Sequence, residues 1–244
     1  MQIPKSHPRY TSLKTRDLIV DGIKKGITSM HGLITHGRGE SFDYLLGEKT
    51  NDFARKSIEA SAALLLIAKN PVISVNGNCA ALVSKELARL SKAINAPLEV
   101  NIFHQSKQRE IKIKKHLEKH GAKNVLLPEK KYEIKHLQSN RKYVNPNGIF
   151  CADVIFVPLE DGDRTEALIK NGKKVITIDL NPLSRTAQKA TITIVDNITR
   201  AMHLLVNKIK EFEKYDKNTL EKIVRDYDNK EMLEEAIKII RLFH

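Results

Sequence analysis

The chain has 244 residues, of which 41% are hydrophobic, and it carries a formal net charge of +13. That length and apolar content are sufficient for a sizeable hydrophobic core. No run of about 18 apolar residues occurs, and the N-terminal sequence MQIPKSHPRY lacks the apolar core of a secretory signal, so we expect a cytoplasmic protein without a membrane partner.

The excess of positive charge is compatible with nucleic acids or acidic small molecules as partners. The lysines are dispersed along predicted helices and mixed with glutamates, as on solvated helix faces. Aromatic residues make up only 5% of the chain and tryptophan is absent, so platforms for base stacking are scarce and we expect no nucleic-acid partner. The two cysteines, Cys79 and Cys151, border apolar runs without metal-ligand spacing, which is typical of buried thiols.

The chain begins with a segment, Ile3–Tyr10, that its two prolines are expected to keep extended. An apolar stripe then predicts a helix over Ser12–Lys25, followed by a glycine that is a natural stop. Arg16 lies on this helix, where an exposed charge is the ordinary interpretation. A second, long helix is expected over Asn51–Lys69, with its first residue as the cap.

Between these helices lies a glycine-rich segment, Gly32–Glu40, which predicts a turn. Glycines on both sides of Arg38 would let the backbone approach a ligand closely and leave the guanidinium uncrowded. The planar fork of arginine suits phosphate, although neither GxxxxGK[ST] nor GxGxxG is present. From this pattern alone, a phosphate-binding loop and a plain surface turn with a solvated arginine both stay open.

The next part alternates short apolar runs with helical patterns, as in parallel α/β folds. Strands are expected at Val72–Val75, Leu98–Phe103 and Val125–Leu127, with helices at Ala80–Ile94 and His104–His120. The polar turn Asn76–Asn78 joins the first strand to its helix, where free N–H groups are available to an anion. The segment Pro128–Gly148 is basic and lacks periodicity, so it is predicted to be either a solvated connection or a mobile functional loop.

The most informative stretch is Cys151–Asn197, which holds three nearly continuous β-branched runs. Runs of this kind are expected of strands buried on both faces of a parallel sheet: Val154–Val157, Val175–Ile178 and Ile192–Val195. They predict an α/β, Rossmann-like three-layer fold with a mostly parallel sheet of about six strands. The remainder is predicted to be helical, with one cap at Asn218, so we expect a single nucleotide-binding domain over residues 1–244 in which residues 198–244 form a packed helical extension.

Polar side chains follow each of these strands, and the carboxyl ends of parallel strands form the ligand crevice of such a sheet. After the first strand come Glu160, Asp161, Asp163 and Arg164. The carboxylates can hold Mg²⁺ through water or phosphate, or cap a helix that begins near Thr165. We expect one of them to cap that helix and a cation or the arginine to compensate the others. Asp161, Asp163 and Arg164 are therefore the catalytic candidates.

The other two strands end in similar groups. Asp179 ends a strand where an acidic residue commonly binds a ribose hydroxyl, and Asn181 follows it. Two hydroxyls and a guanidinium come next, a set suited to phosphate: Ser184, Arg185 and Thr186. The third strand leads into Asp196 and Asn197. The alternative interpretation is a turn followed by a short capped helix.

Six segments, taken in order, carry a family resemblance: IPKSHPRY, GLITHGRGESFDYLLGEKT, VISVNGNCAALV, VPLEDGDRTEAL, ITIDLNPLSRTA and ITIVDNITRA. Together they closely resemble the archaeal 4-phosphopantoate–β-alanine ligase family, also called phosphopantothenate synthetase. The resemblance runs from the N-terminus to about Tyr227 and is interrupted mainly at Pro128–Gly148.

The resemblance implies a homodimeric enzyme of coenzyme A biosynthesis that condenses 4-phosphopantoate with β-alanine. It implies that ATP is converted to AMP and diphosphate, with Mg²⁺ and through an acyl-adenylate. It places ATP contacts on Arg16, Arg38, Asp179, Leu180, Asn181, Ser184, Arg185, Thr186, Asn197 and Ile198. For the phosphate of 4-phosphopantoate the candidates are Lys5, His7, Arg9, Asn76 and Asn78. The motifs leave the metal ligands unassigned, and they leave open whether the two early arginines act within one chain or across a dimer.

Two other classes of function stay open. The positive charge is also compatible with a non-catalytic nucleotide- or nucleic-acid-binding protein, which would bind in a salt-dependent way. A different phosphate-handling enzyme, such as a pantoate kinase, would release ADP instead of AMP. The absence of a phosphate-binding GxxxxGK[ST] loop disfavours the kinase.

Overall fold

The computed structural model describes residues 4–103 and 106–242. At its centre is a sheet of six parallel strands in the order β3-β2-β1-β6-β7-β8. These strands are β1 (Pro71–Val75), β2 (Leu98–Val100), β3 (Val125–Leu126), β6 (Val154–Pro158), β7 (Lys174–Ile178) and β8 (Ile192–Ile194). The Rossmann-like parallel sheet is therefore confirmed. The strand order reverses between β1 and β6, which makes this pair the topological switch point.

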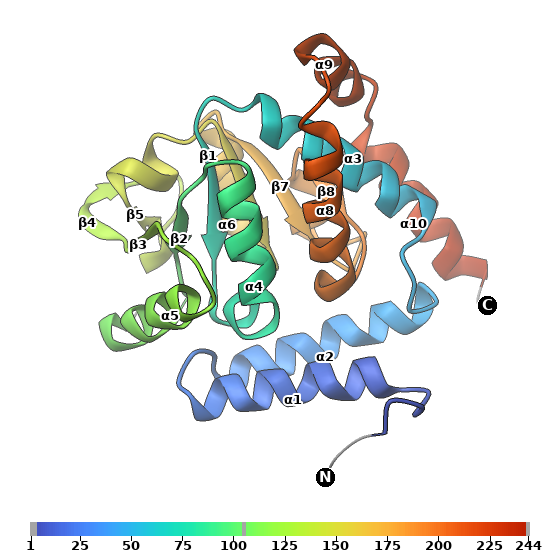
Figure 1. The fold of residues 1–244 in the computed structure, drawn as a ribbon, viewed down its shortest axis with the longest axis horizontal. Coiled ribbons are helices and arrows are strands. Elements are labelled where there is room, and N and C mark those ends of the chain that lie inside the picture. Colours follow the sequence, from blue (N-terminus) through green and yellow to red (C-terminus); the bar gives the residue numbers. More distant parts are fainter. Residues whose placement is uncertain (1–3, 104–105, 243–244) are drawn as a thin grey trace.

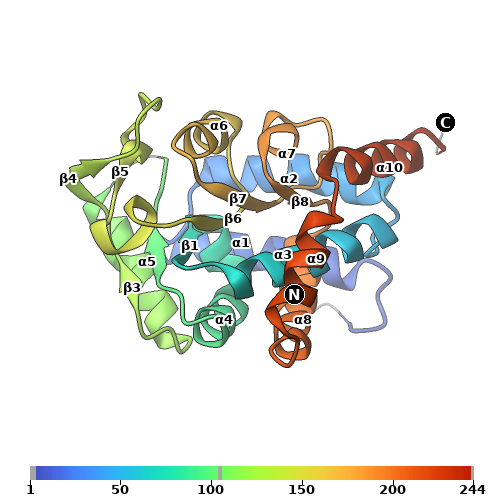
Figure 2. The same ribbon diagram turned by 90° about the horizontal axis from the view of Figure 1, so that it is seen from above.

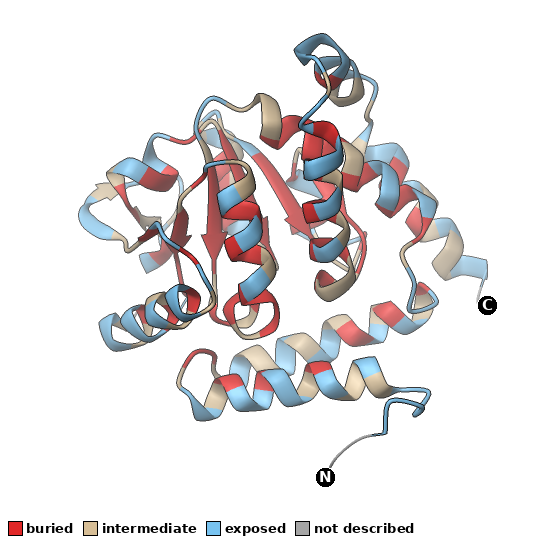
Figure 3. Ribbon diagram, in the orientation of Figure 1, coloured by how far each residue is buried: buried red, intermediate tan, exposed pale blue. Residues whose placement is uncertain are grey.

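Helices cover both faces of the sheet, so the sheet is the middle of three layers (Figure 2). One face carries α4 (Gly77–Ala93), α5 (Lys107–Lys119) and α8 (Ile198–Phe212). The other carries α6 (Gly162–Lys170) and α7 (Arg185–Lys189). The strands are buried almost throughout (Figure 3), because their β-branched side chains pack against helices on both sides.

The predicted C-terminal helices are present. Helix α8 packs on α4 and on α3 (Asp52–Ile67), α9 (Lys217–Arg225) packs on α3, and α10 (Asn229–Leu242) packs on α3 and α7. The N-cap of α9 is Asp216 and not the predicted Asn218, because the Asp216 carboxylate accepts a hydrogen bond from the backbone N–H of Thr219 at 3.0 Å. Within the described ranges, no helix has the length and apolarity needed to cross a bilayer.

The N-terminal helices α1 (Tyr10–Lys24) and α2 (Met30–Leu45) lie side by side across the carboxyl ends of the strands (Figure 1). We call this pair the roof. The turn predicted over Gly32–Glu40 is wrong, since the whole segment is part of α2. One of its glycines permits close packing, since a Cβ added at Gly32 would lie 2.3 Å from the Asn78 side-chain oxygen.

Two further local predictions are wrong. The described part of the N-terminal segment is turned rather than extended, with His7 N–H donating to Pro4 O at 3.0 Å and Tyr10 N–H to His7 O at 2.9 Å. Pro8 occupies the second position of the latter turn, for which its fixed φ is also suited. Cys79 is buried as expected, but Cys151 is exposed. Ile3 and His104, which belong to predicted elements, lie outside the described residues.

The basic segment 128–148 is more ordered than predicted. It contains an antiparallel pair, β4 (Glu129–Glu133) and β5 (Tyr143–Val144), with a 3₁₀ turn at Asn140–Lys142 and a π-helical turn at Pro146–Phe150. The pattern was uninformative because β4 is almost entirely exposed. Scattered apolar residues, among them Ile134 and Val144, anchor the segment to the sheet, together with hydrogen bonds of Arg141 to Asn101 and of Asn145 to Glu99.

Candidate active site

A cavity of about 420 Å³ lies between the roof and the carboxyl edge of the sheet. Its walls come from the α1–α2 connection, from α2, from the start of α5 and from the residues that follow β1, β2, β6, β7 and β8. The cavity therefore spans the switch point between β1 and β6, where open parallel sheets bind their ligands. This is the crevice that the polar strand ends predicted.

Two asparagines hold the walls of the cavity at the switch point. Asn76 caps α4 by accepting from Cys79 N–H at 3.0 Å, and its side-chain N–H donates to Leu159 O, beyond β6, at 2.8 Å. Asn78 accepts from the Thr28 hydroxyl at 2.5 Å and donates to Gly32 O at 2.9 Å. Both asparagines, which were candidates for binding phosphate, line the cavity. Their side chains, however, are engaged in structural hydrogen bonds that join β1 to β6 and the roof to α4.

Several predicted ATP-binding residues gather at the β7–β8 side of the cavity. Leu180, Asn197 and Ile198 line it, next to Gly39 of α2. Asp179 accepts a hydrogen bond from Asn181 N–H at 2.9 Å and another from the Ser184 hydroxyl. Burial raises the pKa of Asp179, although these hydrogen bonds and the nearby charge of Arg38 act in the opposite direction. We call this region the nucleotide side.

Both early arginines lie on the roof, beside residues that line the cavity. Arg38 is exposed on α2, directly before the lining residue Gly39. Arg16, on α1, donates from Nε to the Glu40 carboxylate at 2.8 Å, and Glu40 lines the cavity. Burial would raise the pKa of Glu40, but hydrogen bonds from Ser12 and Arg16 outweigh it and hold the pKa below its usual range.

Other predicted contacts lie away from the cavity lining. Ser184 caps α7 by accepting from Ala187 N–H at 2.9 Å, and the buried Thr186 donates its hydroxyl to Glu160 O at 3.0 Å. Arg185 is exposed and pairs with Asp163 and, at 2.5 Å, with Glu166. In the described N-terminal residues, Lys5, His7 and Arg9 are exposed, and Arg9 donates to Tyr44 OH at 2.5 Å.

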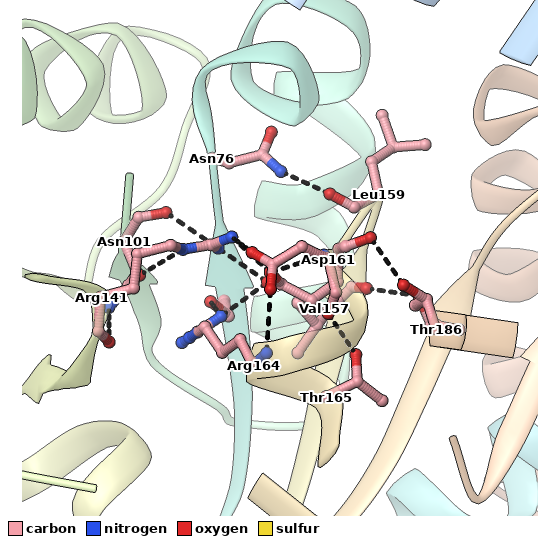
Figure 4. Close-up of polar contacts among 12 residues, drawn as sticks. Asn76, Asn101, Arg141, Val157, Leu159, Asp161, Arg164, Thr165 and Thr186 are labelled. Atoms are coloured by element: carbon pink, nitrogen blue, oxygen red, sulfur yellow. Dashed lines mark hydrogen bonds and ion pairs between the residues drawn. The ribbon is translucent and has the colours of Figure 1, made fainter. Parts of the chain in front are cut away.

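The acidic group after β6 belongs to a buried ionic network. Glu160 is fully buried between Arg141 and Arg164, with its Oε2 accepting from each guanidinium at 2.7 Å. Asp161 caps α6 through Arg164 N–H at 2.8 Å, as expected of one carboxylate, and also accepts from Arg141 at 2.6 Å. Asn101 accepts from Arg141 Nε at 2.9 Å (Figure 4). The two arginines and two carboxylates compensate one another, so the network is electrically neutral.

Sequence reasoning missed Arg141, which lines the cavity and is only 5% exposed. It comes from the 3₁₀ turn of the basic segment, where nothing in the local sequence distinguishes it from the neighbouring solvated cations. A second missed cluster holds the far end of the roof: Arg200 pairs with Asp43 of α2 at 2.5 Å and with Asp196 at 2.6 Å. Only the four-residue spacing of Asp196 and Arg200 was a readable signal.

The residues present do not form a protein cage for a metal ion. Within residues 4–103 and 106–242 no three potential metal-binding side chains gather. Glu40 is the one carboxylate among the described lining residues, and Arg16 already pairs with it. A Mg²⁺ ion that enters with a nucleotide fits this arrangement, because Mg²⁺ keeps most of its waters and binds chiefly through phosphate oxygens.

The fold and the cavity define a Rossmann-like α/β protein with a cavity at the switch point, where open parallel sheets bind their ligands. Comparison with known proteins is more specific. The family profile described as phosphopantothenate/pantothenate synthetase matches residues 53–242, so the chain belongs to that family. Proteins named 4-phosphopantoate–β-alanine ligase from Thermococcus onnurineus and Thermococcus kodakarensis are each 50% identical to it, over 99% of this chain and 93% of the relative. The one from Methanosarcina mazei is 49% identical over 98% and 94%. The similarity thus continues past Tyr227 to the last helix.

Proposed function

We propose that the protein is an ATP-dependent ligase of coenzyme A biosynthesis, which condenses 4-phosphopantoate with β-alanine and releases AMP and diphosphate. The observation that carries the proposal is the near full-length identity to relatives named for this ligase, in a chain whose roof and sheet enclose a cavity at the switch point. The predicted ATP contacts that line the cavity all lie on its β7–β8 side, which leaves the β1–β2 side for the acid.

The geometry suits carboxylate activation. Attack of the acid on the α-phosphate of ATP develops negative charge on the phosphates, which Arg38 and a nucleotide-borne Mg²⁺ would stabilise. The amine of β-alanine then displaces AMP from the acyl-adenylate, a step that needs orientation and exclusion of water rather than a nucleophilic side chain. Arg141 lines this region as part of the neutral network around Glu160, and it offers no free carboxylate or amine that would compete for the activated acyl group.

We further propose a homodimer of single-domain chains in the cytoplasm, with small-molecule partners only. The ionic pairs spread over the surface support a solvated exterior rather than a nucleic-acid interface: for example, Lys208 pairs with Glu59 and Glu211. Size-exclusion chromatography with light scattering tests the dimer, and a filter-binding assay with RNA and DNA over a salt series tests the absence of a nucleic-acid partner.

The deciding experiment is a product assay. Purified protein is incubated with ATP, Mg²⁺, 4-phosphopantoate and β-alanine, and with each acid or amine omitted in turn. AMP and 4'-phosphopantothenate are expected only in the complete mixture. Formation of ADP would instead support a kinase, and the absence of AMP in the complete mixture would refute the ligase.

A further inference from the structure

The cavity has an unequal distribution of charge along its length. Five titratable side chains are among its described lining residues: His31, His36, Glu40, Arg109 and Arg141. Burial lowers the pKa of His36, which favours its neutral form. Apart from the two histidines, the charged side chains of the lining are one carboxylate and two guanidinium groups.

Two of these three charges are already compensated. Glu40 pairs with Arg16 at 2.8 Å. All five N–H groups of Arg141 are directed at acceptors: Nε at the Asn101 side chain, Nη1 at the carboxylates of Glu160 and Asp161, and Nη2 at Glu160 and the Asn101 carbonyl. Arg141 therefore has no donor left for a ligand, and it belongs to a network without net charge.

Arg109 is different. It lies in the first turn of α5, half-buried, on the β1–β2 side of the cavity. Its guanidinium has no ion pair or hydrogen bond with any described residue, whereas its own backbone N–H is bonded to the capping Ser106. Ile102 and Phe103 line the cavity beside it, and apolar walls strengthen a charge–charge interaction by lowering the local dielectric constant.

We propose that Arg109 binds the phosphate of the acid substrate and so selects the phosphorylated acid over the unphosphorylated one. The proposal rests on the ligase function proposed above, and it names the residue that distinguishes 4-phosphopantoate from pantoate. Among the earlier phosphate candidates, Asn76 and Asn78 use their side chains to hold the walls, and Lys5, His7 and Arg9 do not line the cavity. A planar guanidinium can give two parallel hydrogen bonds to phosphate oxygens.

The placement also fits the order of groups along the reacting molecules. The nucleotide side lies beyond the switch point from Arg109, so an acid held by its phosphate at α5 would extend its carboxylate toward the nucleotide. Holding the phosphate at one end converts binding energy into orientation of the carboxylate at the other.

The test measures the affinity for each acid separately. Isothermal titration with 4-phosphopantoate and with pantoate is carried out on the wild type, Arg109→Gln, Arg109→Lys and the control Arg89→Gln. Arg89 is an exposed arginine of α4 outside the cavity lining, so its variant has the same loss of charge without the proposed contact. Circular dichroism and thermal unfolding of all variants verify the fold. Replacing Arg109 is not expected to affect it, because its guanidinium has no partner among the described residues.

The wild type and Arg89→Gln should bind 4-phosphopantoate more tightly than pantoate. In Arg109→Gln the affinity for 4-phosphopantoate should fall roughly 10- to 150-fold while that for pantoate changes little, so that the preference disappears. Arg109→Lys should restore part of it, since it keeps the charge but not the fork. In steady-state assays, Arg109→Gln should raise the KM for 4-phosphopantoate and leave the KM for ATP nearly constant.

A preference for the phosphorylated acid that survives in Arg109→Gln would overturn the proposal, as would equal losses for both acids. Failure of the proposed function is a separate result, because it is the absence of AMP from the wild-type reaction. The binding preference is measured without turnover and decides the role of Arg109 in either case.

Discussion

Replacing Glu160 by glutamine should destabilise the protein strongly, because it removes the buried charge that two guanidinium groups share. Glu160 and Arg164 are both fully buried, and the described residues give Arg164 no other ion pair. Its Nε and Nη2 already lack hydrogen-bond partners there, and the Glu99 carboxylate acts on it through charge alone, without an ion pair or hydrogen bond among the described residues. Leaving a buried charge without its partner costs about 3–5 kcal/mol of unfolding free energy.

Urea unfolding monitored by circular dichroism measures this loss as a decrease in the midpoint at constant slope. Glu166→Gln is the matched control, because Glu166 lies on α6, shortly after Glu160 in the chain, and bonds to Arg185 and Lys170 at the surface, where solvent screens the pairs. A second variant, Glu160→Gln with Arg164→Met, should recover much of the loss by removing the uncompensated cation. Equal midpoints for Glu160→Gln and Glu166→Gln would refute the assignment of a buried ionic network.

Three other predictions concern the site and the fold. Arg38→Ala should raise KM for ATP about tenfold or more, the value of a charged hydrogen bond, and unchanged ATP kinetics would remove Arg38 from the site. Gly77→Ala should lower the free energy of unfolding by about 1–3 kcal/mol and weaken the binding of all substrates, because the added Cβ would lie 2.6 Å from Ile27 O under the roof. Gly37→Ala is the control: an added Cβ there has nothing within 4 Å, so thermal unfolding should show a neutral or slightly stabilising effect. Burial raises the pKa of Glu99 from 4.5 to about 7, so between these pH values the folded state holds a proton that the unfolded state releases. The free energy of unfolding should therefore fall as pH rises from 4.5 to 7, by at most about 3 kcal/mol. Glu99→Gln should remove that dependence in unfolding titrations at several pH values, and an unchanged profile would contradict it.

The parallel sheet could be predicted because its information is local. Strands such as Val154–Pro158 and Lys174–Ile178 are buried on both faces, and so their sequences are apolar almost without interruption. The strand ends then followed from the geometry of any open parallel sheet. A capping carboxylate after β6 could be expected because a cap acts on a neighbour three residues away, and the structure shows that it is Asp161.

The roof and the ionic network could not be predicted for the opposite reason. Gly32 and Gly39 have low helix propensity, and Gly32 contacts Asn78, which is 46 residues further along the chain. Tertiary packing here outweighs the local preference for a turn. Arg141 likewise differs from a surface arginine only through Asn101 and Glu160, its partners 40 and 19 residues away.

The roof also bears on the order in which the protein is made. Its two helices are synthesised before the sheet, yet Thr28 bonds to Asn78, 50 residues on, and Asp43 pairs with Arg200, 157 residues on. Contacts across such long loops form late, because loop closure must precede them. The cavity is therefore closed only after the chain beyond β8 has emerged and docked. A nascent or truncated chain that stops short of α8 would carry the roof helices without an enclosed site, and so could not use a nucleotide prematurely.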